Sequence, residues 1–196
     1  MKANFSCGPR TRSGFVMGVW VILLFILPLP LAFAAPFERV SQPTLKPGAP
    51  IPAPKSKVVL TITGATARAN RGDKLAFDRP TLEKLGLISY KNSNRWYKDP
   101  VTYVGVLGST LLKVIGIPKN ATKLKLRAVN DYIIDIPLED FERWPVMFAL
   151  KLNGDYLTLR DKGPIWVVYP THLDEALSGP EHSGKWIWQL KSMIVE

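Results

Sequence analysis

The sequence contains a single cysteine, Cys7, and none follows it over the rest of the 196 residues. Beyond Cys7 the chain therefore offers no disulfide, no thiolate nucleophile and no cysteine ligand for a metal. Its two histidines, His172 and His182, have no third ligand at metal spacing, which argues against a zinc site. A glycine-rich phosphate loop and a nucleophile elbow are also absent. No motif in the chain predicts an enzyme by itself.

Acidic residues are missing from the N-terminus, where the first is Glu38. Three cationic residues precede an apolar run over 19–31, which is short for a membrane span and is interrupted by two prolines. Ala32-Phe33-Ala34 follows as an A-x-A cleavage signal. We interpret residues 1–34 as a signal peptide that is cleaved after about Ala34 and directs the protein to the periplasm. An uncleaved membrane anchor is the alternative.

The residues after Ala34 carry a net charge of +7, because 23 of the 26 Lys and Arg residues and all 16 acidic residues lie there. These cations are scattered along the sequence and form no basic stripe of the kind that follows a nucleic-acid backbone. We therefore expect no nucleic-acid partner. Anionic ligands and membrane headgroups remain possible partners for a basic protein.

Residues 35–56 are rich in proline and poor in large apolar side chains, which predicts an extended, solvated leader. Residues 57–196 then alternate short β-branched and apolar runs with turn residues. This pattern predicts an α+β domain of seven or eight strands and three short helices. The expected strands are 58–63, 101–107, 123–129, 132–137, 147–152 with a partner after Asn153-Gly154, 165–169 and 185–195. The expected helices are 79–86, a segment from Ser109 or Thr110 to Gly116, and a segment from Pro137 to Phe141.

Aromatic, amide and charged side chains are frequent in the loops and at the strand ends. Trp186 and Trp188 are two residues apart, so they point to the same face of a strand. A flat heteroaromatic ligand requires stacking faces together with polar groups that bind the ring edge. We therefore predict a binding site formed by Trp166, Asp161, Trp96, Arg95, Asn130, Asp131, Trp186 and Trp188. The alternative is that the tryptophans fill a small core.

Four segments follow one another along the chain: YVGVLGSTLLKVIGI, LRAVNDYIIDIPLEDF, ALKLNGDYLTLRDKGPIWVVYP and the closing WQLKSMIV. In their residues and in their order they resemble the molybdopterin-binding domain of the sulfite oxidase family. The resemblance covers roughly residues 57–196. It implies a sulfite oxidase molybdopterin-domain-like fold, a mixed β-sheet structure with short helices.

The departures from this family concern the cofactor. Catalytic members bind molybdenum through a cysteine in a loop that reads KNSNRWYKD here. Trp166 stands where they usually carry an arginine for the cofactor phosphate, Trp188 aligns near a lysine, and Asp161 stands near an asparagine. The loss of the thiolate and of two cations argues against molybdopterin and against a metal.

The pattern is closer to small exported members of this fold that lack the cysteine. These resemble periplasmic pterin-binding proteins that act beside membrane-bound cyclic-di-GMP enzymes. The resemblance implies that Trp166, Trp96 or Trp188 stacks on a pterin-like ring. It also implies that Asp161 or Asp131 accepts hydrogen bonds from the amino edge of the ring.

In the same reading, Asn130 or Arg95 binds the 4-oxo group. The chain would then be a non-catalytic binding protein whose loops at 91–100 and 171–184 respond to the ligand. Its partner would be an inner-membrane sensor enzyme, contacted through the periplasmic domain of that enzyme. Two alternatives remain: a molybdopterin-dependent oxidoreductase with atypical metal ligation, and a structural or protein-interaction domain.

Overall fold

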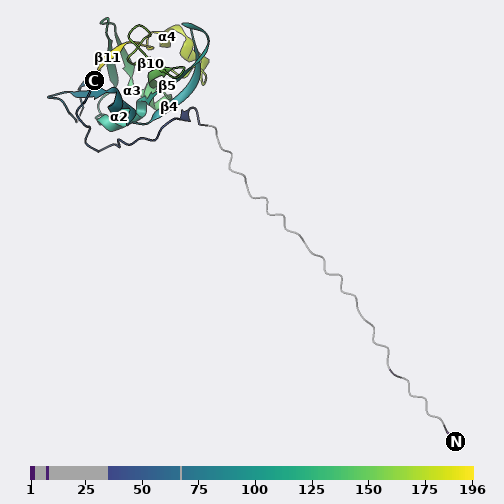
Figure 1. The fold of residues 1–196 in the computed structure, drawn as a ribbon. Helices are drawn as coiled ribbons and strands as arrows, with labels where there is room; N and C mark the ends of the chain where they lie inside the picture. The colour runs from purple at the N-terminus through teal and green to yellow at the C-terminus, as the bar shows by residue number, and fades with distance from the viewer. Residues whose placement is uncertain (3–7, 9–34, 67) are drawn as a thin grey trace. The chain divides into compact units, whose positions relative to one another are not determined.

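The computed structural model describes residues 1–2, 8, 35–66 and 68–196 (Figure 1). Residues 35–196 belong to one compact unit. The expected signal peptide and its cleavage site fall almost wholly outside the described residues. Within the described residues, no helix is both long and apolar enough to cross a membrane.

The first sheet has the strand order β1-β4-β5-β8-β10, and β9 pairs with β8 beside this path. All of its pairings are antiparallel. Its strands are β1 (Glu38–Arg39), β4 (Leu87–Asn94), β5 (Tyr97–Leu107), β8 (Met147–Leu152), β9 (Asp155–Tyr156) and β10 (Trp166–Val168). The turn Asn153-Gly154 joins β8 to β9, with both residues at positive φ, as the hairpin prediction requires.

The second sheet has the order β3-β2-β11-β6-β7. Its strands are β2 (Val58–Gly64), β3 (Leu75–Asp78), β6 (Lys123–Ala128), β7 (Ile133–Pro137) and β11 (Leu190–Val195). The last strand, β11, runs parallel to β2 and antiparallel to β6. This parallel pair makes the second sheet a mixed sheet. With its short helices, the structure confirms the predicted α+β fold class.

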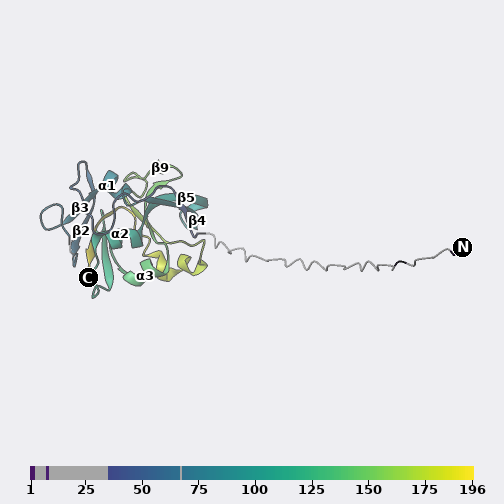
Figure 2. The same cartoon turned by 90° about the horizontal axis from the view of Figure 1, so that it is seen from below.

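Short helices connect the strands. They are α1 (Arg79–Glu83), α2 (Gly108–Ile115), α3 (Leu138–Arg143), the 3-10 helix η1 (Glu175–Ser178) and α4 (Pro180–Ser183). Helix α2 buries Leu111, Val114 and Ile115 on one side and ends at Gly116, whose φ of 74° is the left-handed conformation that glycine adopts without strain. Figure 2 shows α1 beside β9, where the Tyr156 hydroxyl donates a hydrogen bond to Glu83 at 2.6 Å.

The expected loop at 91–100 is instead the end of a long hairpin. Strand β4 continues to Asn94 and β5 begins at Tyr97, so only Arg95 and Trp96 form the turn. Strand β4 itself, together with β3, was not among the expected strands. The expected loop at 171–184 contains the two short helical segments η1 and α4.

The proline-rich leader is extended, as predicted, but it is not free in solvent. Strand β1 pairs with β4, and Leu45 is buried in the core. The Asp78 carboxylate accepts hydrogen bonds from the backbone N–H groups of Lys55 and Ser56 at 2.8 and 2.9 Å. Residues 35–56 are therefore docked along the domain at Leu45 and Asp78, although most of them remain exposed to solvent.

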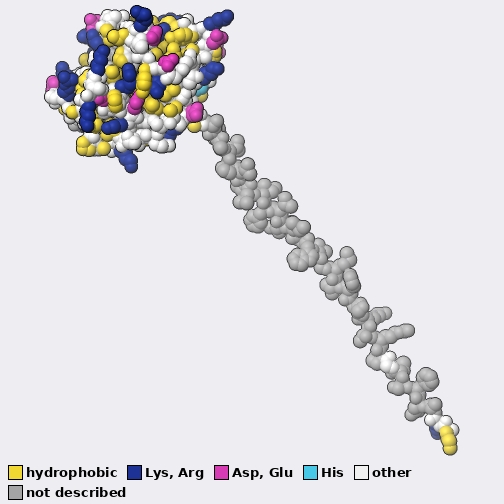
Figure 3. All heavy atoms as spheres, in the orientation of Figure 1, with side chains coloured by type: hydrophobic (Ala, Val, Ile, Leu, Met, Phe, Trp, Pro, Cys, Tyr) yellow, Lys and Arg dark blue, Asp and Glu magenta, His cyan; other side chains and the backbone are white. Residues whose placement is uncertain are grey.

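Charged side chains are spread over the surface of the domain. On the face shown in Figure 3, Lys and Arg side chains are interspersed with hydrophobic, acidic and other side chains. Several cations are paired: Lys123 and Lys125 contact Glu196, and Lys191 contacts Asp131 at 2.8 Å. The strongly basic composition is thus partly neutralised along β6 and β11.

Candidate functional site

The turn between β4 and β5 is fixed by Asn94. Its side-chain oxygen accepts hydrogen bonds from the backbone N–H groups of Trp96 and Tyr97 at 2.9 and 3.2 Å. Its amide nitrogen donates to the Tyr103 hydroxyl at 2.9 Å. This local pattern, in which an Asn side chain bonds the backbone two residues further on, is typical of tight turns. It holds Arg95 and Trp96 in place at the tip of the hairpin.

Trp96 packs at the centre of a group of indoles. Its ring centroid lies 5.2 Å from that of Trp166, 5.6 Å from that of Trp186 and 5.4 Å from that of Trp188. The contacts to Trp166 and Trp188 are edge-to-face, which is a favourable arrangement for aromatic rings. The hairpin tip, β10 and the segment before β11 therefore meet through tryptophan side chains.

Trp166 belongs to the core. Its side chain is 0% exposed, and its indole N–H donates to the carbonyl oxygen of Trp186 at 3.2 Å. Tyr103 packs edge-on against it at 5.3 Å on another side. Its faces are covered by other side chains, so it has the core role that the sequence left as the alternative to a stacking wall. Trp166 supports the site from behind by holding Trp96 and the backbone of Trp186.

Two adjoining hollows lie at the surface of this tryptophan group, with volumes of about 290 and 220 Å³. Arg95, Ser183 and Trp186 line both of them, so we call them together the Arg95 cleft. Asn130 and Trp188 belong to the larger hollow, and Trp96 to the smaller. The cleft therefore unites five of the predicted residues: Arg95, Trp96, Asn130, Trp186 and Trp188.

The larger hollow combines aromatic surface with hydrogen-bonding groups. Trp186 and Trp188 supply indole surface, and Arg95 supplies a cation that lies 4.8 Å above the ring of Trp96. The side-chain oxygen of Asn130 accepts from the backbone N–H of Tyr132 at 3.2 Å, which leaves its NH₂ group as a donor. A flat ring with acceptor atoms along one edge matches these groups.

The two predicted carboxylates lie elsewhere. Asp131 pairs with Lys191, whose hydrogen bond and charge hold the pKa of this exposed carboxyl below its ordinary value. Asp161 accepts a hydrogen bond from the Thr158 hydroxyl at 2.7 Å in an exposed turn. Neither residue lines the Arg95 cleft. The structure thus does not bring either carboxylate to the Arg95 cleft, where the predicted contact with the amino edge of the ligand would require it.

Lys162 was not predicted, although it contacts the tryptophan group. Its ammonium lies 5.0 Å from the ring centroid of Tyr97, 5.2 Å from that of Trp166 and 5.9 Å from that of Trp188. These distances are those of cation–π contacts. No sequence signal marks this residue, since its position depends on a positive φ of 69° in the loop before β10.

Asn92 connects the hairpin to the segment after β10. It is buried, and it donates to the carbonyl oxygen of Tyr169 at 2.7 Å. Its side-chain oxygen accepts hydrogen bonds from the Thr171 hydroxyl and from the backbone N–H of His172. The His172 ring lies 3.0 Å from the carbonyl oxygen of Pro36 in the leader. A chain of polar contacts thus runs from the hairpin, through residues 169–172, to the leader.

A second buried network holds the other side of the cleft. The Asp140 carboxylate accepts from the Tyr169 hydroxyl at 2.6 Å and pairs with Lys185 at 2.9 Å. Burial, together with the neighbouring Asp140 carboxylate, raises the pKa of Tyr169 well above its ordinary value, so the hydroxyl remains a donor. Lys185 directly precedes Trp186, so this network fixes the backbone that carries the aromatic wall.

The donor atoms near the cleft do not fit thiolate-bound molybdenum. The only cysteine of the chain, Cys7, lies outside the described residues. Among the described residues, no group of three or more His, Cys, Asp or Glu side chains could hold a metal ion. The cleft offers indoles, amides, hydroxyls and a guanidinium, which are groups that bind an organic ring.

Comparison with known proteins agrees with this fold. The sequence model of the oxidoreductase molybdopterin-binding domain matches residues 54–193. No curated protein matches the chain significantly. Among solved structures, the chain resembles the sulfane dehydrogenase SoxCD from Paracoccus pantotrophus, with a TM-score of 0.53 and 18% identity. That match covers 69% of this chain and 37% of the other, so the chain spans little more than a third of that protein.

Proposed function

The chain belongs to the family of oxidoreductase molybdopterin-binding domains and has its sulfite oxidase-like fold, and from this premise we propose that it binds a pterin-like molecule without transforming it. The observation that carries the proposal is the composition of the larger hollow of the Arg95 cleft. There, two indoles, a guanidinium and an amide donor surround one space. A family that binds molybdopterin supplies a site for a pterin ring, and the described residues of this member include no cysteine thiolate for the metal end.

The roles of the residues follow from their positions. Trp188, which is partly exposed, supplies the face on which the ring stacks, and Trp186, which is only 4% exposed, contributes the edge of the same wall. Arg95 donates hydrogen bonds to the 4-oxo group, and the NH₂ group of Asn130 donates to a ring acceptor. Because Arg95 lines both hollows, a change of its rotamer on binding would join them into one larger site. Drug-sized ligands occupy sites of about 300–1,000 Å³, so the joined cleft suits a bicyclic ring with a short side chain.

A signal from the bound ligand would travel through Asn92 and Thr171. The smaller hollow is lined by Ser93 and Trp96 of the hairpin and also by Thr171 and Ser178 of the segment after β10. A ligand that contacts both segments stabilises one arrangement of them relative to others. The contact between His172 and Pro36 extends this arrangement to the leader.

The proposed setting is the periplasm, after removal of residues 1–34. There the ligand-bound surface formed by the hairpin tip, residues 171–184 and the leader would be recognised by the periplasmic part of an inner-membrane cyclic-di-GMP enzyme. The protein itself would be the sensor, and the membrane enzyme would supply the catalysis. Support for this setting comes from the basic, apolar N-terminus and its A-x-A signal.

The test is to identify what the purified protein carries. Extraction followed by mass spectrometry should release a pterin without a metal, and elemental analysis should find molybdenum far below one atom per chain. The Arg95→Ala variant should carry much less of the pterin. The Lys98→Ala variant, which removes an exposed cation of β5 that does not line the cleft, should carry the normal amount. Stoichiometric molybdenum would contradict the proposal and favour an oxidoreductase with atypical ligation.

A further inference from the structure

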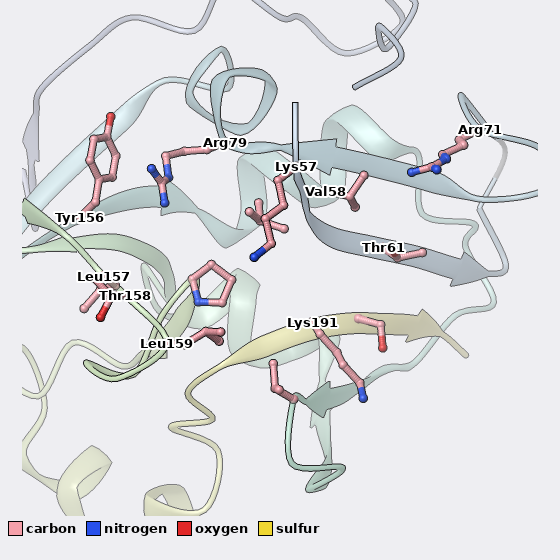
Figure 4. A pocket seen from close by; sticks show the side chains of 14 residues that line it. Lys57, Val58, Thr61, Arg71, Arg79, Tyr156, Leu157, Thr158, Leu159 and Lys191 are labelled. Carbon is pink, nitrogen blue, oxygen red and sulfur yellow. The ribbon is translucent and has the colours of Figure 1, made fainter. Parts of the chain in front are cut away.

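A second cavity, of about 910 Å³, lies between β2, α1, β9 and β11. It shares no lining residue with the Arg95 cleft. Four cationic side chains line it: Lys57, Arg71, Arg79 and Lys191. We call it the Lys57 pocket. In Figure 4 the ammonium of Lys57 points toward the middle of the pocket, with Arg79 and Tyr156 on one side and Lys191 on β11 opposite.

The charges of this pocket are poorly balanced. No Asp or Glu side chain lines it. Within the described part of the chain, Lys57, Arg71 and Arg79 take part in no ion pair, and only Lys191 has a carboxylate partner, Asp131. Arg79 lies 4.2 Å above the ring of Tyr156, which orients its guanidinium without neutralising it. The pocket therefore favours an anion.

The same pocket exposes apolar surface. Leu159 is 50% exposed and Val129 is 44% exposed, and the half-buried Val58 and Pro164 complete an aliphatic wall. Exposed apolar patches of this kind, bordered by polar groups, mark binding surfaces more often than isolated exposed side chains do. An aliphatic wall differs from the indole surface of the Arg95 cleft, and it suits a flexible hydrocarbon chain better than a flat ring.

The apolar wall is held in place despite its exposure. The Gln189 amide donates to the carbonyl oxygen of Leu159 at 2.6 Å. The carbonyl oxygen of Thr158 accepts from the N–H groups of Asp161 and Gly163 at 3.0 and 2.6 Å. Gly163 approaches the backbone so closely that an added Cβ would lie 2.3 Å from the carbonyl oxygen of Leu157. The loop that carries Leu157 and Leu159 is therefore a formed wall.

We propose that the Lys57 pocket binds an anionic amphiphile, a molecule with a phosphate or carboxylate head and an aliphatic body. The head lies between Lys57 and Arg79, and the aliphatic body lies against Leu159 and Pro164; Arg71 stands at the far end of the pocket (Figure 4). The cavity volume is within the range of small-molecule sites, about 300–1,000 Å³. Such a ligand could be a free amphiphile or a lipid of an anionic membrane, and the two sources share the same chemistry.

Isothermal titration of the purified protein with dodecyl phosphate, below its micelle concentration, tests the proposal. The expected result is saturable binding of one molecule per chain, with dodecyl maltoside, which has the same chain and a neutral head, binding at least tenfold more weakly. Inorganic phosphate alone should also bind more weakly, because it lacks the apolar body. Equal affinity for the charged and the neutral amphiphile, or no binding of dodecyl phosphate, would overturn the proposal.

Two matched variants locate the site. The Lys57→Glu/Arg79→Glu variant reverses two cations that have no ion-pair partner among the described residues, and it should weaken dodecyl phosphate binding at least tenfold. The control Lys98→Glu/Lys119→Glu changes the net charge equally at exposed positions outside the pocket and should bind like the unmodified protein. Equal weakening in both variants would contradict the proposal, because net charge alone would then explain the binding.

Vesicles distinguish the two sources. Cosedimentation with phosphatidylglycerol vesicles that is lost in the Lys57→Glu/Arg79→Glu variant and kept in the control would assign the ligand to a membrane lipid. Binding of dodecyl phosphate without binding of vesicles would assign it to a free amphiphile. Binding of vesicles by both variants, together with failure to bind the soluble amphiphile, would overturn the proposal that the Lys57 pocket binds an anionic amphiphile. The pterin content of the Arg95 cleft should be the same in all these variants, so the two proposals are tested separately.

Discussion

The indole N–H of Trp166 donates to the backbone carbonyl oxygen of Trp186 at 3.2 Å, which joins a fully buried residue to a wall of the Arg95 cleft. The residues of the tryptophan group thus have two roles. Trp166 fixes the wall from inside the core, whereas Trp188 is partly exposed and lines the larger hollow. Stability and ligand binding should therefore respond differently to changes at these two positions.

Replacing Trp166 should mainly lower stability. The Trp166→Ala change removes a buried indole and leaves a cavity, so the free energy of unfolding should fall by about 3–5 kcal/mol. Urea denaturation followed by circular dichroism measures this change. A loss below about 1 kcal/mol would show that Trp166 is not the core residue that its 0% exposure indicates.

Replacing Trp188 should mainly lower affinity for a pterin. Trp188→Ala removes a stacking face at the cleft, and we expect about five- to tenfold weaker binding of tetrahydropterin with only a small change in stability. Isothermal titration measures both the affinity and the stoichiometry. Tyr156→Ala, which removes an exposed aromatic ring outside the Arg95 cleft, should leave pterin affinity unchanged. An equal effect of the two changes would argue against stacking on Trp188.

Replacing Thr171 should uncouple the hairpin from the segment after β10. The Thr171 hydroxyl bonds the side-chain oxygen of Asn92 and lies 2.9 Å from the carbonyl oxygen of Ser93. Thr171→Val keeps the shape and should cost about 1–2 kcal/mol of stability. Hydrogen exchange should show that pterin protects residues 171–184 and the leader in the unmodified protein but protects only the cleft in the variant. Undiminished protection of the leader in Thr171→Val would show that Thr171 does not couple the Arg95 cleft to the leader.

Acid should release the leader through Asp78. Burial alone would raise the pKa of this carboxyl, but hydrogen bonds donated by Thr81, and by the backbone of Lys55 and Ser56, lower it well below the ordinary value. Its contribution to stability is therefore complete above the unfolded-state pKa of about 3.9 and is lost as the pH falls below it.

The Asp78→Asn variant tests this linkage. At pH 7 it should be less stable than the unmodified protein by about 1–3 kcal/mol, because it lacks a charged acceptor for these donors. Urea denaturation at pH 7, 4 and 3 should show the difference shrinking as the pH falls. A constant difference over this range would mean that Asp78 titrates normally.

The sequence predicted much of the fold because most strands have one buried and one exposed face. Strand β6, with its alternating buried residues, is an example. Strand β10 is buried on both faces, so alternation could not show whether Trp166 faces the core or a cleft. The leader was predicted as extended from its prolines, but its docking depends on Leu45 and on Asp78, which composition does not reveal.

The candidate site was predicted in part for a similar reason. Arg95 and Trp96 lie in a turn fixed by the neighbouring Asn94, so local sequence was enough to place them together. Asp131 was assigned to the ligand because its partner, Lys191, is sixty residues away and could not be identified from the sequence. Contacts between residues so far apart in the sequence depend on the pairing of β6 with β11, which the strand pattern alone does not determine.

A fluorescence titration of the purified protein with tetrahydropterin tests the proposed pterin site in the Arg95 cleft. Trp186 and Trp188 line the larger hollow, so a ring stacked there should quench their emission with a saturable, one-to-one dependence on concentration. The quenching should shift to at least tenfold higher concentration in Arg95→Ala and should be unchanged in Lys98→Ala. Absence of saturable quenching, or identical curves for both variants, would contradict a pterin site in the Arg95 cleft.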